Sequence, residues 1–248
     1  MPLPLEDSFA DIVGKARRGL HKPSAPLPQE ENAIRALAAD LGMNPDALLA
    51  SARGSWQPDP VRAIPGLHMF TTPFGDLQVN SYAISDPATG AAAAIDTGSD
   101  CSDLLALGLR IEKIFITHTH GDHIFDLDRL VEKTGAEALA GFREPLEGAS
   151  LVQDHAVLQI GSLRIEAIPT PGHAPGGITW FATGLAHPVA FTGDALFAGS
   201  MGGADSHWQA ALDSLRLKIL ALPDDTILCP GHGPLTTVAW EKKHNPFA

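Results

Sequence analysis

The chain has 248 residues, of which 44% are hydrophobic and 19% are charged, and its formal net charge is −12. This length suits one large domain, or one domain with a small appendage, and the composition is typical of a globular protein. The acidic excess disfavours nucleic acid and anionic membranes as partners, because their binding depends on clustered lysine and arginine. We therefore expect a small-molecule substrate.

Neither a membrane span nor a secretory signal is expected from the sequence. No apolar run reaches the roughly 18 residues that cross a bilayer, and the first residues carry Glu6, Asp7 and Asp11 where a signal peptide would be apolar. The two cysteines, Cys101 and Cys229, form no C-x-x-C pair and are expected to be free thiols. These features predict a cytoplasmic protein, while the oligomeric state stays open.

Residues 1–60 have the pattern of a short helical N-terminal extension. Apolar residues at helical spacing and capping residues predict three helices in it. Their ranges are Leu5–Leu20, Glu30–Asp40 and Pro45–Ser51, and Pro58, Pro60 and Pro65 then mark a linker. Three short helices bury little area by themselves, so we expect the extension to pack on the main domain.

From Gly66 onward, short apolar runs alternate with helical patterns. The runs predict strands at Leu67–Thr71, Leu77–Ile84, Ala91–Ile95, Lys113–Ile116, Ala156–Ile160, Leu163–Ile168, Ile178–Ala182, Pro188–Phe191 and Thr226–Leu228. Helices are expected after Asp100, at Asp122–Thr134 before Gly135, and at Trp208–Leu220. This order predicts an α/β catalytic domain over residues 66–248, with two sheets and helices outside them.

A dense group of potential metal ligands follows one of the predicted strands. The segment from Thr117 to His123 reads THTHGDH and places His118, His120, Asp122 and His123 on one strand-to-helix turn. Packing these side chains together without a compensating cation would be costly. Imidazole and carboxylate ligands suit Zn²⁺, Fe²⁺ or Mn²⁺, so the cluster predicts a metal site.

Three later turns carry further candidates, each beside glycine. They are His173 in TPGH, Asp194 in TGD and His232 in PGHG, and glycine allows close backbone approach because it lacks Cβ. Together with the first cluster these residues supply five imidazoles and two carboxylates. That set is sufficient for two metals with a bridging carboxylate.

These motifs resemble the metallo-β-lactamase superfamily, and more closely its glyoxalase II-like, or hydroxyacylglutathione hydrolase-like, branch. The resemblance runs from about Gly66 to Pro246, and its first motif is the AIDTG segment that contains Asp96. It implies an αββα four-layer sandwich. It also implies that His118, His120 and His173 hold one metal, that Asp122, His123 and His232 hold the second, and that Asp194 bridges them. Asp96 would support the ligands from behind.

The resemblance further implies a hydrolase that cleaves a thioester or related activated ester with a metal-bridging hydroxide. Zn²⁺ is the expected metal, with Fe²⁺ or Mn²⁺ as alternatives, and Asp122 is the expected proton shuttle. The C-terminal helical domain of full-length glyoxalase II does not follow Phe247, and the segment from Gly199 to Asp205 lacks the arginine of the family's Gly-Arg-x-Asp motif. The use of glutathione therefore stays open.

Two other activities fit the same motifs. A lactonase on this fold would use identical ligands, and an iron-dependent persulfide dioxygenase would use one iron on two histidines and an aspartate. The intact pair of His173 and His232, with its Pro-Gly-His-Gly ending, weighs against the dioxygenase. Arg143, in a turn, is a weak candidate for binding a substrate carboxylate.

Overall fold

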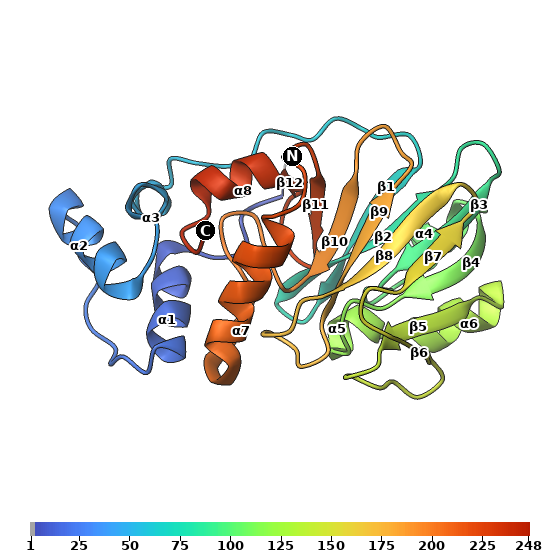
Figure 1. Cartoon of the computed structure of the whole chain (residues 1–248), viewed down its shortest axis with the longest axis horizontal. Helices are drawn as coiled ribbons and strands as arrows, with labels where there is room; N and C mark the ends of the chain where they lie inside the picture. The colour runs from blue at the N-terminus through green and yellow to red at the C-terminus, as the bar shows by residue number, and fades with distance from the viewer. Residues whose placement is uncertain (1–2) are drawn as a thin grey trace.

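The structure is a computed structural model that describes residues 3–248, and it is built around two six-stranded sheets (Figure 1). The first sheet has the order β1-β2-β3-β4-β5-β6, with bounds Leu67–Phe74, Leu77–Ser85, Ala91–Ile95, Arg110–Phe115, Glu137–Gly141 and Ser150–Val152. The second has the order β12-β11-β10-β9-β8-β7, with bounds Thr236–Thr237, Ile227–Pro230, Val189–Gly193, Ile178–Thr183, Leu163–Pro169 and Val157–Ile160.

Helices cover the outer faces of both sheets. The helical elements are α1 (Phe9–Gly19), α2 (Glu31–Leu41), α3 (Pro45–Ala52), α4 (Ser102–Ala106), α5 (Gly121–Ile124), α6 (Leu127–Thr134), η1 (Asp205–His207), α7 (Trp208–Asp213), the π-helical turn η2 (Ser214–Ile219) and α8 (Val238–His244). Figure 1 shows α1, α2 and α3 at the left end of the long axis, beside α7 and α8, with the sheets to the right. None of the helices in residues 3–248 is long and apolar enough to cross a bilayer.

Three apolar clusters hold the layers together. The cluster between the sheets contains Phe115, Trp180 and Phe191. A second packs the outer face of the first sheet against α4 and α6 through Leu104 and Leu130, and a third joins the second sheet to α1–α3, α7 and α8. This arrangement confirms the predicted α/β class and the two sheets with helices outside them.

Strand β3 of the first sheet is buried on both of its faces. All five of its residues are buried, and because side chains alternate across a strand, Ala93 and Ile95 face the cluster between the sheets while Ala92 and Ala94 face the helices. A strand covered on both faces reads as a continuous apolar run. Strand β3 also pairs in parallel with β4, so the two strands end at the same edge of the sheet.

The N-terminal helices are present and packed against the body of the protein. A capping box between Ser8 and Asp11 starts α1, and Asn44 caps α3 through the backbone nitrogens of Asp46 and Ala47. Ile12 of α1 lies in the same cluster as residues of α7 and α8. The domain boundary between residues 60 and 66 stays a prediction.

Several predicted elements differ from the structure. The expected helix Asp122–Thr134 is two helices, α5 and α6, separated at Phe125 and Asp126, although Gly135 ends the second as expected. The expected helix Trp208–Leu220 changes to a π-helical turn at Ser214, whose hydroxyl donates to the carbonyl of Pro171 at 2.7 Å. Strands β5, β6 and β12 and helix α8 were not predicted.

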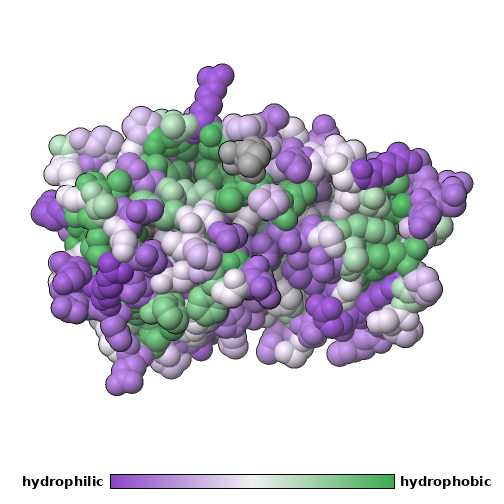
Figure 2. All heavy atoms as spheres, turned by 180° about the vertical axis from the view of Figure 1, so that it is seen from behind, coloured by the Kyte–Doolittle hydropathy of each residue, from purple (hydrophilic) through white to green (hydrophobic). Residues whose placement is uncertain are grey.

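The surface mixes polar and apolar side chains. Figure 2 shows hydrophilic residues over much of the back face, with hydrophobic side chains gathered in several patches between them. Large exposed hydrophobic residues include Leu77, Phe125 and Leu217, which are 46%, 67% and 70% exposed.

Two glycines of α1 test whether the extension is part of the folded core. A Cβ added at Gly19 would lie 2.2 Å from Cδ2 of Trp208, whereas one added at Gly14 meets only the Arg18 guanidinium at 3.4 Å. Gly19→Ala should lower the free energy of unfolding by about 1–3 kcal/mol through overpacking. Gly14→Ala should raise it by up to about 1 kcal/mol through helix propensity. Equal effects of the two variants in denaturant unfolding would contradict packing of α1 on Trp208.

Candidate metal centre

The seven candidate ligands lie where strands of both sheets end. His118 and His120 follow β4 and lead into α5, which carries Asp122 and His123. The other three, His173, Asp194 and His232, follow β8, β10 and β11. Strands β10 and β11 are parallel neighbours, as are β3 and β4, so their carboxyl ends bring these turns to one edge of the sandwich.

The ligand atoms form three overlapping groups in which all atoms lie within 4.8 Å of one another. The groups are His118, His120 and His173; His118, His123 and Asp194; and Asp122, His123 and His232. Asp194 lies between the two outer groups, because its Oδ2 atom is 3.5 Å from both His173 Nε2 and His232 Nε2. The structure thus brings all seven residues together, and their binding of metal stays a prediction.

Second hydrogen-bond partners fix the rings of several candidate ligands. The Nδ1 atoms of His173 and His232 donate to the carbonyls of Gly203 and Gln78 at 2.9 and 2.7 Å. This leaves their Nε2 atoms turned toward the centre of the cluster. His120 has the opposite orientation, with its Nδ1 2.9 Å from His173 Nε2. Such partners set the tautomer of a ligating imidazole.

Asp96 supports both halves of the cluster from behind. Its carboxylate accepts from His123 Nδ1 at 2.8 Å and from the Thr117 amide and hydroxyl at 2.8 and 2.7 Å. The Thr117 hydroxyl oxygen lies 3.1 Å from His118 Nδ1 and can accept its proton. Asp96 is buried and has a φ of 54°, a left-handed conformation that is costly for a residue with a side chain. We therefore assign it a positioning role.

Two buried ligand atoms at the centre have no hydrogen-bond partner. They are His123 Nε2 and Asp194 Oδ1, which lie 3.2 Å apart. Leaving buried polar atoms unpaired is expensive, and a cation between them would satisfy both. The donor set of imidazoles and carboxylates suits Zn²⁺, Fe²⁺ or Mn²⁺. The residues therefore fit divalent metal ions.

The charges within the cluster compensate one another in the protein alone. Burial would lower the pKa of His123, but the carboxylates of Asp194 and Asp96 raise it to about 10. Burial likewise opposes protonation of His232, while hydrogen bonds to Asp122 and Asp194 raise its pKa to about 11. Burial would raise the pKa of Asp194, yet the adjacent imidazoles hold it well below its ordinary value. In the protein without metal, protons on His123 and His232 thus supply positive charge that metal cations would otherwise supply.

Gly231 is required by close approach to the ligands. A Cβ at this position would lie 2.3 Å from Asp194 Oδ1 and 2.5 Å from His123 Cε1. Only glycine can occupy such a place without displacing a ligand. The PGHG motif therefore supplies the candidate ligand His232 and, at Gly231, the room that Asp194 and His123 need.

Other residues that brace the site were missed by the sequence analysis. Glu144 accepts from the Thr119 amide and hydroxyl and from the Gly176 amide, tying together the turns that carry His120 and His173. The Asn80 side chain donates to the carbonyls of Pro230 and Gly233 on either side of His232. Their partners are backbone groups distant in sequence, so the sequence holds no motif for them.

The N-terminal extension also reaches the site. Lys15 pairs with Asp7 and donates to the carbonyl of Met201 at 2.9 Å, and Asp7 accepts from the Ser200 hydroxyl. The same loop holds His173 through the Gly203 carbonyl. The extension thus fastens a loop that positions a candidate ligand.

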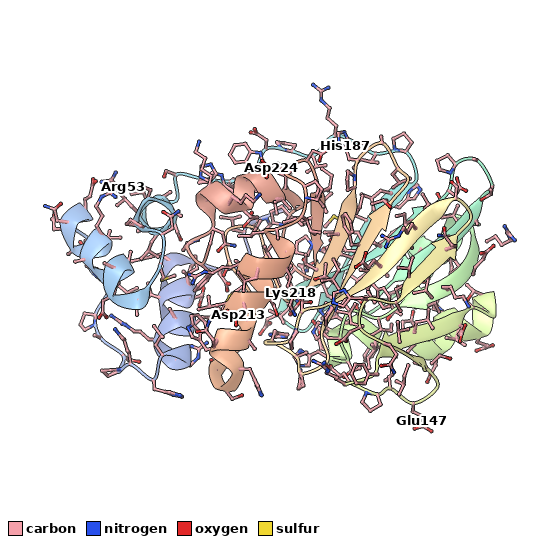
Figure 3. All side chains as sticks on the ribbon, in the orientation of Figure 1. Arg53, Glu147, His187, Asp213, Lys218 and Asp224 are labelled. Atoms are coloured by element: carbon pink, nitrogen blue, oxygen red, sulfur yellow. The ribbon has the colours of Figure 1, made fainter. Side chains whose placement is uncertain are left out.

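Two basic residues near the turn of His173 are engaged in structural contacts. Arg143 is half-exposed and pairs with Asp154 at 2.9 Å. Lys218, labelled on η2 in Figure 3, donates to the carbonyl of Pro169 at 2.6 Å. A role of Arg143 in binding a substrate carboxylate stays a prediction.

Comparison with known proteins gives a consistent picture. A family model described as the metallo-beta-lactamase superfamily matches residues 74–141 and 141–232. The probable metallo-hydrolase YqgX of Bacillus subtilis is 30% identical over 204 residues, which cover 71% of this chain and 94% of that protein. Hydroxyacylglutathione hydrolase GloC of Haemophilus influenzae is 30% identical over 187 residues, covering 63% and 86%.

Solved structures show the same fold. The crystal structure of ETHE1 from Myxococcus xanthus has a TM-score of 0.63 and 29% identity, covering 72% of this chain and 83% of its own. The crystal structure of TTHA1623 in a di-iron-bound form has a TM-score of 0.58 and 28% identity, covering 72% and 100%. The family match begins after the N-terminal helices, which end at Ala52.

Substitution of Gly231 should remove metal without removing the fold. Gly231→Ala should lower metal content by at least half, because its methyl group would displace Asp194 or His123. Gly14→Ala is the control, since this glycine lies on α1 away from the candidate ligands and a Cβ there meets only the Arg18 guanidinium at 3.4 Å. Elemental analysis of both folded variants checks this. Full metal content in Gly231→Ala would contradict the arrangement.

Metal loading should release protons. His123 and His232 have raised pKa values and are protonated in the metal-free protein at neutral pH, whereas ligating imidazoles must be neutral. Adding Zn²⁺ to chelator-treated protein should therefore release protons from both rings, in addition to any lost by metal-bound water, and affinity should fall as the pH is lowered. A pH-indicator titration measures the release, and His232→Gln should release about one proton fewer. Binding without proton release would contradict these charge states.

Proposed function

We propose that this chain, which belongs to the metallo-beta-lactamase superfamily, is a hydrolase that uses two divalent metal ions to cleave a thioester or a related activated ester. The observation that carries the proposal is the position of Asp194, whose carboxylate lies between two groups of three ligand residues. The similarity to a hydroxyacylglutathione hydrolase and to a di-iron-bound protein supports it.

His118, His120 and His173 would hold one metal, Asp122, His123 and His232 the other, and Asp194 both. Zn²⁺ is the metal we propose, with Fe²⁺ or Mn²⁺ as alternatives. When bound, the two ions would act as Lewis acids on the scissile carbonyl and on the attacking water. A thiolate leaving group needs little protonation, which makes a thioester a natural substrate.

The side chains of the protein would orient the reaction and move the proton. The Asp122 carboxylate is 3.2 Å from His232 Nε2 and its side chain is 13% exposed, so it is among the more open ligands. In the metal-free protein burial would raise its pKa, but the hydrogen bond to His232 and the charge of His123 lower it, so the carboxylate is ionised and available to bind a cation. We assign it the transfer of a proton from the attacking water toward the leaving group.

A lactonase would use the same residues, so the substrate distinguishes these activities. A panel of S-lactoylglutathione, uncharged thioesters and acyl-homoserine lactones should identify the preferred ester. Elemental analysis should give about two metals per chain. At most one metal after reconstitution would favour a single-iron dioxygenase instead.

Asp194→Asn is the sharpest test of the two-metal mechanism. The amide keeps the shape but removes the negative charge that compensates two nearby cations. We expect weaker binding of the second metal and a fall in kcat by a factor on the order of 10² or more. Arg143→Ala is the control and should keep kcat, because Arg143 pairs with Asp154. Two metals and near-native turnover in Asp194→Asn would disprove the bridging role.

A further inference from the structure

A groove of about 240 Å³ lies next to the turn that carries His232 and is built partly from the N-terminal extension. It is lined by Leu3–Glu6, by Asp76–Gln78 at the turn between β1 and β2, and by Gly233. Gly233 directly follows His232, and the Gln78 carbonyl accepts from His232 Nδ1 at 2.7 Å. The groove is therefore continuous with the wall that holds a candidate ligand.

The N-terminal segment lies close against the end of the PGHG motif. A Cβ added at Gly233 would lie 3.4 Å from the Glu6 nitrogen and 3.5 Å from the Pro4 carbonyl oxygen. Asp7, the next residue, is held by Lys15 and Ser200. These contacts fix the segment beside the site, so its side chains can form a defined wall.

The lining of the groove is apolar with acidic edges. Leu3, Leu5 and Leu77 provide apolar surface, and Leu77 is 46% exposed. Among residues 3–248, its charged lining residues are Glu6 and Asp76, and no lysine, arginine or histidine lines it. Lys15, which contacts the following residue Asp7, is paired with that carboxylate. An anionic ligand would be repelled here, whereas an uncharged apolar one would gain by burial.

We propose that this groove binds an uncharged apolar chain of the substrate and so selects neutral apolar esters over anionic glutathione thioesters. The inference rests on the proposed hydrolase function. The volume is below the roughly 300–1,000 Å³ of pockets for drug-sized ligands, which suits a short alkyl chain. Since Leu3–Glu6 precede the region matched by the family model, whereas Asp76–Gln78 lie inside it, part of the selectivity would come from the extension.

Binding of inert analogues tests the groove independently of catalysis. S-alkyl N-acetylcysteamine thioethers, from ethyl to hexyl, carry the chain but have no scissile bond. Calorimetry on metal-reconstituted protein should show affinity rising by up to about fourfold per added methylene. Leu77→Glu should abolish this rise by placing a carboxylate in the groove. Leu217→Glu, at a residue that is 70% exposed on η2, is the control and should keep it.

The outcomes separate this inference from the proposed function. A flat affinity series in the wild type, or an unchanged slope in Leu77→Glu, overturns the groove even if acetyl thioesters are hydrolysed. A normal slope without hydrolysis of any ester in the panel supports the groove and contradicts the proposed function. In the hydrolysis series, kcat/KM should follow the same chain-length slope and should be lower for glutathione thioesters. A preference for glutathione thioesters would also overturn the inference.

Discussion

The structure depends on seven candidate ligand side chains whose potential donor atoms face one another in a largely buried space. An unpaired charge or lone pair in such a place costs several kcal/mol, so the arrangement is stable only with compensating protons or cations. His123 Nε2 and Asp194 Oδ1, both buried and without hydrogen-bond partners, lie at the point where that cost is greatest. The surrounding turns are arranged to hold these atoms in place: four strands end at the site, and glycine at position 231 leaves room for the carboxylate.

Asp96 fixes the positions of residues in both halves of this cluster. It holds His123 directly and, through Thr117, can hold His118, so one carboxylate orients a residue in each outer ligand group. Its left-handed backbone is costly, and three hydrogen bonds to its carboxylate compensate for it. Because β3 and β4 are parallel and end together, Asp96 and Thr117 meet at the sheet edge without a long connection. The buried strand β3 thus positions Asp96 beside the candidate metal centre as well as forming part of the core.

Local patterns in the sequence predicted most of this architecture but not its tertiary details. The cluster from His118 to His123 and the later His173, Asp194 and His232 could be found because ligand residues stand beside glycine at the ends of apolar runs. The break between α5 and α6 could not, since Asp126 turns to accept from the Cys101 amide, 25 residues away. The π-helical turn depends in the same way on Ser214 meeting Pro171. Short strands such as β5 and β6 are set by pairing with neighbours rather than by their own composition.

The N-terminal extension has a larger structural role than its composition alone suggests. Its few apolar residues gave the expectation of an appendage, yet Lys15 and Asp7 form a largely buried pair that bonds the Met201 carbonyl and the Ser200 hydroxyl. A buried ion pair gains little net free energy, so its value is in specifying geometry. The geometry it specifies is that of the loop whose Gly203 carbonyl orients His173. A segment outside the family match therefore supports a residue inside the candidate centre, and the same segment brings Leu3 and Leu5 to the groove beside His232. Support of the ligands and shaping of the groove are thus coupled through one stretch of chain, so a change in this stretch would alter both together.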